Sequence, residues 1–245
     1  MNYRDVLKFW RRKQISNSAD LEFAINGKII LIAYHSTKIE NDLVTYNDTR
    51  SIFEHDSVSN FTGDLRTIYE IRNSKDAFNE LLESFNQKLP LDRDLILRFH
   101  FQLTKDTYDK TRLDYGESPG SFKKRDYIVG RDEVGALPED VEIEIGELLD
   151  ELIDVRDSQI LKAAAYFHCK FENIHPFADG NGRTGRLAMN YFLILHDYPP
   201  TIIFEQDRNE YFSALEDWDS HQEIFAMIDF LENQTLKTWQ KNLSR

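Results

Sequence analysis

The segment from His175 to Arg186 constrains the fold most, because it places a short turn between two apolar helical patterns. Apolar residues recur at helical spacing from Ile160 to Ile174. Pro176 drives the preceding residue toward extended backbone, so the first helix should end before it. A second apolar run, from Leu187 to Leu195, follows Asn181, a residue type that favours the N-cap of a helix. The pattern predicts helix, tight loop, helix.

The charged side chains of this segment indicate an anion site. Arg183 and Arg186 lie one turn apart at a helix N-terminus, where a cation is disfavoured by roughly 0.3–1 kcal/mol. Free N–H groups at this end bind anions, and two arginines beside them favour a polyphosphate. Asp179 is then a candidate ligand for a divalent metal held against the phosphates. His175 is a candidate base for an attacking hydroxyl.

The segment also fits other patterns in part. Gly180, Gly182 and Gly185 match the spacing of the dinucleotide fingerprint, but that fingerprint follows a strand, and the preceding segment here is helical. The P-loop pattern fails because no Lys-Ser or Lys-Thr follows the glycines. A lone histidine at a helix end is usually structural, and an arginine pair is usually a solvated face or a salt-bridge partner.

The sequence HPFADGNGRTGR resembles the Fic-domain signature, His-Pro-Phe-x-(Asp/Glu)-Gly-Asn-Gly-Arg-x-x-Arg, at every specified position. The resemblance extends through the flanks KAAAYFHCKFENIHPF and RLAMNYFLILHDYPP. It implies an all-α, Fic-type helical bundle with a small β-hairpin flap. It also implies a protein adenylyltransferase (AMPylator), which moves AMP from ATP to a hydroxyl of a protein, itself included, with Mg²⁺ as cofactor.

The resemblance assigns roles to individual residues. His175 would deprotonate the target hydroxyl, and Asp179 would hold Mg²⁺ on the α- and β-phosphates. Tyr211 is the candidate for an aromatic contact with adenine, although a tyrosine that only packs fits nearly as well. The residues expected to bind the nucleotide are Asp179, Gly180, Asn181, Gly182, Arg183, Thr184, Gly185, Arg186, Ile128, Val129, Gly130 and Tyr211.

Residues 114–137 interrupt the helical pattern with several glycines and one proline. Phe122 and the run Tyr127-Ile128-Val129 are strand-like, so the segment is predicted to form a β-hairpin. It resembles the flap of Fic proteins, where a protein target docks by strand addition. Lys123 and Lys124 would help to hold an acidic target, or serve only solubility.

The stretch Ser36-Thr37-Lys38-Ile39-Glu40-Asn41 resembles the inhibitory motif (Ser/Thr)-x-x-x-Glu-(Gly/Asn) of many Fic proteins. The spacing alone is weak, because Ser18 and Glu22 share it. Beside a Fic signature, it implies that Glu40 pairs with Arg186 and competes with the γ-phosphate of ATP. The alternative is an exposed glutamate at a helix end. Some relatives with such a glutamate also remove AMP, and the sequence leaves this open.

Composition limits the remaining functions. The 245 residues carry a net charge of −13, which argues against broad nucleic-acid binding and against attraction to anionic membranes. The single cysteine, Cys169, permits no intrachain disulfide and favours a reducing compartment. The N-terminus lacks an apolar signal core. We therefore expect a cytoplasmic protein, and the sequence leaves open whether it forms a homo-oligomer.

The remaining pattern predicts helices and two regions: an N-terminal helical region, 1–59, with the inhibitory motif, and a Fic core domain, 60–245. The helices are expected over 2–15, 19–39 with an interruption at Asn26-Gly27, 48–55, 64–87 with a break near Asn73-Ser74, 91–106, 139–155, 207–217 and 222–241. Two rival functions remain: a phosphotransferase or other nucleotide-dependent transferase on the same fold, and a non-enzymatic regulatory protein that binds a nucleotide.

Overall fold

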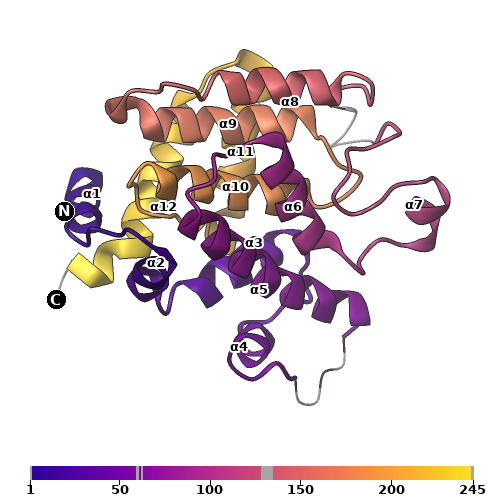
Figure 1. The fold of residues 1–245 in the computed structure, drawn as a ribbon, viewed down its shortest axis with the longest axis horizontal. Coiled ribbons are helices and arrows are strands. Elements are labelled where there is room, and N and C mark those ends of the chain that lie inside the picture. Colours follow the sequence, from indigo (N-terminus) through magenta and orange to yellow (C-terminus); the bar gives the residue numbers. More distant parts are fainter. Residues whose placement is uncertain (1, 59–60, 62, 128–134, 244–245) are drawn as a thin grey trace.

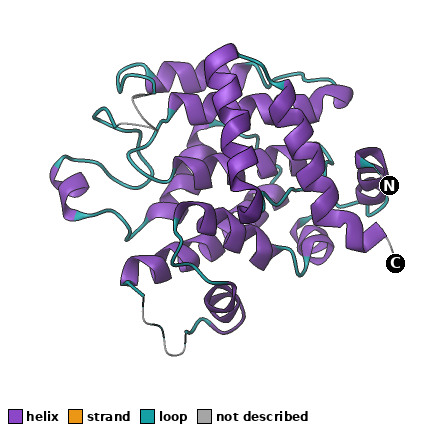
Figure 2. Ribbon diagram, turned by 180° about the vertical axis from the view of Figure 1, so that it is seen from behind, coloured by secondary structure: helices purple, strands orange, loops and turns teal. Residues whose placement is uncertain are grey.

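The computed structural model describes residues 2–58, 61, 63–127 and 135–243. Within them every regular element is helical (Figures 1 and 2), which confirms the all-α prediction. The elements are α1 (Tyr3–Arg11), α2 (Ser18–Ile25), α3 (Ile29–Glu40), α4 (Tyr46–His55), α5 (Leu65–Asn86), α6 (Arg93–Thr104), α7 (Lys110–Asp114), α8 (Val141–Asp150), η1 (Asp157–Gln159), α9 (Ile160–Ile174), α10 (Asn181–Leu195), η2 (Glu205–Asp207), α11 (Arg208–His221) and α12 (Phe225–Leu243).

Of the two helices that flank the loop, α10 lies in the middle of the bundle and α9 lies beside it, next to α8 (Figure 1). α10 packs against α9 and also contacts α3, α5 and α6. Every residue from Arg183 to Ile194 is buried. A surface helix buries only one stripe, whereas α10 is covered on all sides. Each large apolar side chain buried in this way contributes roughly 1.5–3 kcal/mol, so the start of α10 is held firmly in place.

The N-terminal helices pack directly on this bundle. α1 lies against α12, where the Trp10 and Trp239 rings meet edge to face with centroids 5.2 Å apart. α2 and α3 lie against α5, and the chain turns between them at Gly27, whose φ of 77° suits glycine. The predicted interruption at Asn26-Gly27 is therefore confirmed. Because α3 also contacts α10, the N-terminal region reaches the central helix.

The predicted break near Asn73-Ser74 is wrong, because α5 continues through both residues. Asn73 Nδ2 donates to the carbonyls of Leu103 (3.3 Å) and Lys105 (2.6 Å). Ser74 Oγ donates to Glu70 O at 2.9 Å and hydrogen-bonds Thr37 Oγ1 at 3.0 Å. These polar side chains connect α5 to α6 and α3, so they serve tertiary contacts rather than a helix end.

The β-hairpin expected over 114–137 is not supported, since the described part of this segment contains no strand. Its backbone donors have other acceptors. Lys124 N donates to the buried carboxylate of Glu117 at 3.0 Å, and Lys123 N donates to Pro176 O at 2.9 Å. Donors engaged in this way cannot form a strand ladder. Ile128, Val129 and Gly130 lie outside the described residues.

One set of buried apolar residues runs from Val6 in α1 to Trp239 in α12. Cys169 is buried within it. No helix in the described ranges is both long and apolar enough to span a bilayer.

Candidate active site

The loop between α9 and α10 is closed by its own polar groups. α9 ends at Ile174, and the next residue, His175, caps it with φ 50° and donates its N–H to Phe171 O at 3.0 Å. Gly180, with φ 83°, precedes α10. Asn181 is therefore not the N-cap that the sequence predicts. Its side chain instead accepts from Phe177 N and donates to Phe177 O, both at 2.8 Å, and so ties the loop to the first residue of α10.

His100 on α6 packs against the loop and holds it in place, a role that the sequence pattern does not indicate. Its ring stacks on Phe177 with centroids 3.7 Å apart. Gly120 N donates to His100 Nδ1 at 2.9 Å, so the ring proton belongs on Nε2, which lies 2.9 Å from Asp179 O. Burial lowers the pKa of His100 to about 3, which keeps it neutral in this role.

His175 is well suited to accept a proton. Burial first, and then the charge of Lys123, lower the pKa of His175 to about 4. The imidazole is therefore neutral near pH 7. The backbone bond from Lys123 to Pro176 places the segment that precedes the undescribed residues 128–134 beside this histidine.

Asp179 is surrounded by arginines. Its Oδ2 lies 2.6 Å from Arg66 Nη2, and its Oδ1 lies 3.3 Å from Arg183 Nη2. Burial would raise the pKa of Asp179, but the charges of Arg183, Arg66 and Arg112 hold it below its ordinary value. The carboxylate is therefore ionised, and both of its oxygens are paired with arginines.

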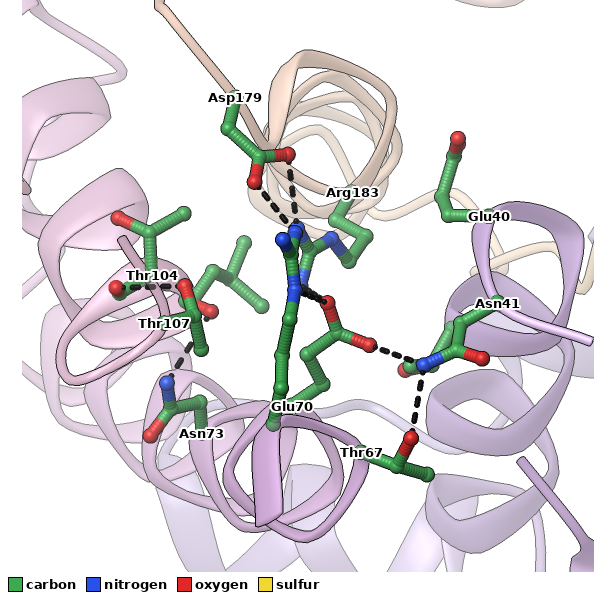
Figure 3. A network of polar contacts seen from close by, with 12 residues as sticks. Glu40, Asn41, Thr67, Glu70, Asn73, Thr104, Thr107, Asp179 and Arg183 are labelled. Carbon is green, nitrogen blue, oxygen red and sulfur yellow. Dashed lines mark hydrogen bonds and ion pairs between the residues drawn. The ribbon is translucent and has the colours of Figure 1, made fainter. Parts of the chain in front are cut away.

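A network of charged groups joins Asp179 to the end of α3 (Figure 3). Glu70 Oε1 accepts from Arg66 Nε at 3.0 Å and lies 3.6 Å from Arg183 Nη1. Asn41 Nδ2 donates to Glu70 Oε2 at 2.7 Å. Neither Glu70 nor Arg66 belongs to the signature, and an i,i+4 Arg-Glu pair on a helix is too common a pattern to reveal them in the sequence.

Arg183 and Arg186 are both buried, but they have different partners. Arg183 Nε and Nη1 are buried without a hydrogen-bond partner among the described residues, although Nη1 lies 3.6 Å from Glu70 Oε1. Arg186 is held mainly by α3: its Nε donates to Ser36 Oγ at 3.0 Å, and its Nη2 donates to Ser36 O at 2.9 Å and to Glu40 Oε1 at 2.8 Å.

Glu40 covers the start of α10. A Cβ on Gly182 would collide with Glu40 Oε1 and would lie 2.8 Å from Arg186 Nη1. Only glycine therefore allows the carboxylate to approach so closely. Since free N–H groups at a helix start attract anions, Glu40 occupies a place where an anionic ligand would bind.

These groups line one pocket of about 280 Å³. The predicted residues His175, Asp179, Gly180, Asn181, Gly182, Arg183, Arg186, Tyr211 and Glu40 line it, together with Glu172, Ala178 and Phe212. Ser36, Thr184 and Gly185 do not, although Ser36 binds Arg186.

Tyr211 is almost fully buried at the pocket. Its hydroxyl accepts from Arg186 Nη1 at 3.3 Å and lies 2.7 Å from Nε2 of the core residue His168. The neighbouring Phe212 is exposed at the pocket rim and was missed by the sequence pattern.

Glu172, also missed, carries a buried carboxyl group beside the pocket. Its Oε1 has no hydrogen-bond partner among the described side chains and backbone. Burial, which outweighs the opposing charge of Arg186, raises the pKa of Glu172 to about 8. The group is therefore largely protonated near pH 7.

Known proteins share both sequence and fold with this chain. The Fic/DOC family profile matches residues 90–193. A protein adenylyltransferase Fic of Nematostella vectensis is 30% identical over 231 residues, which cover 91% of this chain and 51% of that protein. The protein of the same name from Drosophila persimilis is 32% identical over 210 residues, which cover 84% of this chain and 39% of that protein. The chain thus spans about half or less of these relatives.

A solved structure of a Fic domain containing signaling protein from Bacteroides thetaiotaomicron has a TM-score of 0.83 to this chain at 19% identity. The match covers 100% of this chain and 96% of that one. At this identity the likeness establishes the fold alone.

Proposed function

The chain carries a Fic domain, and on that premise we propose that it is a protein adenylyltransferase, which moves AMP from ATP to a hydroxyl side chain of a protein. The observation that supports this most is that one pocket is lined by a neutral imidazole, two buried arginines at a helix start and a carboxylate. General-base chemistry on a bound polyphosphate needs these groups together.

In this proposal His175 takes the proton from the target hydroxyl. The hydroxyl oxygen then bonds to the α-phosphorus of ATP, the bond from that phosphorus to the oxygen leading to the β-phosphate breaks, and pyrophosphate leaves. Arg183 and Arg186 hold the β- and γ-phosphates, and the N–H groups of Asn181 and Gly182 stabilise the developing charge. Tyr211 and Phe212 provide aromatic surface for the base, while Ile128, Val129 and Gly130 remain candidates for nucleotide contacts.

Mg²⁺ belongs to the proposal, with Asp179 as its protein ligand. The described residues hold no group of three or more His, Cys, Asp or Glu side chains able to bind a metal by themselves. This suits Mg²⁺, which commonly takes one or two carboxylates and completes its shell with phosphates and water. The ionised carboxylate of Asp179 at the pocket wall fits that role. When bound, the ion neutralises phosphate charge.

The target would lie along the 114–137 segment. The bond from Lys123 N to Pro176 O supports this, because it holds the segment next to His175. Self-modification is included, since the chain supplies hydroxyl side chains of its own.

We also propose that Glu40 inhibits the enzyme and that Ser36 assists by binding the same arginine, Arg186. The ion pair of Glu40 with Arg186 and the position of Glu40 over Gly182 support this. A γ-phosphate needs the same guanidinium, so bound ATP and the Glu40 pair exclude each other. In this scheme the region 1–59 regulates and the region 60–245 catalyses.

Labelled ATP tests the proposal. Glu40→Gly should increase self-modification from α-labelled ATP, and His175→Ala in the same background should abolish it. Glu22→Gly is the matched control, because Ser18 and Glu22 repeat the spacing of the motif on a surface helix. Transfer of label from γ-labelled ATP alone would indicate a phosphotransferase. ATP binding without any product in Glu40→Gly would indicate a regulatory nucleotide site.

A further inference from the structure

Arg66 occupies an unusual position for a cation. It is the second residue of α5, where the partial positive charge of the helix start disfavours arginine. Its guanidinium is nevertheless held by two carboxylates, with Nε 3.0 Å from Glu70 Oε1 and Nη2 2.6 Å from Asp179 Oδ2. The contact with Asp179 joins residues 113 positions apart, so the fold rather than the local helix creates it.

Arg66 is one of four groups that alternate in charge around a ring. Arg66 binds Asp179, Asp179 binds Arg183, Arg183 lies beside Glu70, and Glu70 binds Arg66. The side chains differ sharply in exposure: 41% for Arg66, but 3% for Arg183 and 4% for Glu70. Arg66 is therefore the member of the ring that is free to swing into solvent.

A metal ion on Asp179 would compete with Arg66. Mg²⁺ binds carboxylate oxygens at about 2.0–2.1 Å and demands a nearly octahedral shell. The Arg66 guanidinium, 2.6 Å from the same oxygen, both blocks that shell and repels a divalent charge. Arg183 is fixed by burial, so Arg66 is the arginine that must move away from Asp179 when the metal binds.

We propose that Arg66 is the resident counter-ion of the metal-binding carboxylate. It neutralises Asp179 while no metal is bound and releases it when the metal–nucleotide complex enters. Its Nε stays on Glu70 at 3.0 Å, so the side chain remains tethered and returns when the products leave. Arg66 thereby sets the metal concentration that the site requires. Arg66 acts through Asp179 and is a positioning residue. The inference rests on the proposed function.

Metal binding tests the inference without any turnover. The Glu40→Gly chain is mixed with a non-hydrolysable ATP analogue, and Mn²⁺ binding is followed by loss of the free-ion EPR signal. Arg66→Ala should lower the Mn²⁺ concentration at half-saturation by about three- to tenfold, the range expected from loss of a partly exposed ion pair. Arg66→Lys keeps the charge but not the two-point contact with Glu70 and Asp179, so its Mn²⁺ requirement should lie between those of the parent and Arg66→Ala.

Arg98→Ala is the matched control, because Arg98 is a similarly exposed arginine paired with Glu80 at 3.0 Å and lines no part of the pocket. Arg66→Gln, which keeps most of the side-chain length, repeats the test if alanine loosens the start of α5. An unchanged or raised Mn²⁺ requirement in both Arg66→Ala and Arg66→Gln, with analogue binding intact, would overturn the counter-ion role and leave AMP transfer standing. If the parent binds no analogue, both proposals fail.

Discussion

The two arginines at the start of α10 lie one turn apart, yet different parts of the chain hold them. Arg183 sits in a ring with Glu70, Asp179 and Arg66, and Glu70 is only 4% exposed. Arg186 is held by Ser36 and Glu40 at the end of α3, and the Glu40 carboxylate is 38% exposed. One arginine is thus fixed within the core, whereas the other is held by a group that can leave.

This difference has an energetic basis. Breaking a buried ion pair leaves an uncompensated charge and is expensive, whereas an ion pair with one accessible partner costs less to open. Arg186 also keeps Ser36 O, Ser36 Oγ and the Tyr211 hydroxyl as acceptors when Glu40 departs. The structure therefore favours regulation through the Glu40–Arg186 ion pair, whereas the buried contacts of Arg183 are expected to stay in place. The following predictions test that contrast, from the largest effect to the smallest.

Glu70→Ala should have the largest effect. It removes the buried carboxylate beside Arg183, and we expect a loss of about 3–5 kcal/mol in the free energy of unfolding. Urea denaturation measures this. Glu80→Ala, which removes the partner of the exposed Arg98, is the control and should cost about 1 kcal/mol or less. Equal losses in the two variants would contradict the contrast.

Glu40→Ala should change ligand binding more than stability. Removal of the Glu40 carboxylate frees Arg186 and also removes the repulsion between that carboxylate and the phosphates, so binding of an ATP analogue should tighten about tenfold or more. Unfolding free energy should fall by only about 1 kcal/mol. Calorimetric titration and urea denaturation separate the two quantities. A stability loss as large as that of Glu70→Ala, without tighter binding, would make Glu40 a structural residue.

Glu172, whose carboxyl group interacts with Arg186, should make the free energy of unfolding depend on pH. The pKa of Glu172 is raised from 4.5 to about 8 in the folded chain, so between about pH 4.5 and 8 the folded state holds a proton that the unfolded state has lost. Stability should therefore fall as pH rises through this window, by at most about 1.4 kcal/mol per pH unit.

Glu172→Gln should flatten that dependence in thermal unfolding measured at several pH values. Glu40→Ala should shift the window to lower pH, because the Glu40 charge helps to raise the pKa of Glu172. A slope that is identical in the parent and Glu172→Gln would assign the pH dependence to other groups.

Asn41→Ala should have the smallest effect. It removes the hydrogen bonds from Asn41 Nδ2 to Glu70 (2.7 Å) and Thr67 (3.1 Å), and we expect a loss of about 1 kcal/mol in stability. Asn41→Asp should cost more, since it places a second negative charge beside Glu70. Urea denaturation of both variants checks the order. The reverse order would show that Asn41 does not connect α3 to the Glu70 ring.

Much of the candidate site was predictable because it is local. His175, Asp179 and the two arginines fall within one short segment, and helix-end chemistry alone indicates an anion there. Other features depended on partners distant in sequence. Asn181 looked like a helix cap but binds Phe177, and the polar pair Asn73-Ser74 looked like a break but joins α5 to its neighbours. Propensity describes a residue without its tertiary contacts, so it misassigned these three.

The 115–127 backbone shows the same limit. Its glycines and strand-like residues predicted a hairpin, but the Glu117 carboxylate and Pro176 carbonyl accept its N–H groups instead. A sequence pattern cannot reveal which acceptor pairs with a given backbone N–H group in the folded chain.

Periodicity and helix-end electrostatics operate within a few residues, so the sequence was enough to predict the helical class and the turn between two buried helices, and to suggest the residues that we propose act on a phosphate. Only the tertiary structure decided how those residues are restrained. It placed Glu40 on Arg186 across 146 positions and Arg66 on Asp179 across 113. Charged groups interact according to distance in space, and folding, not spacing along the chain, sets that distance.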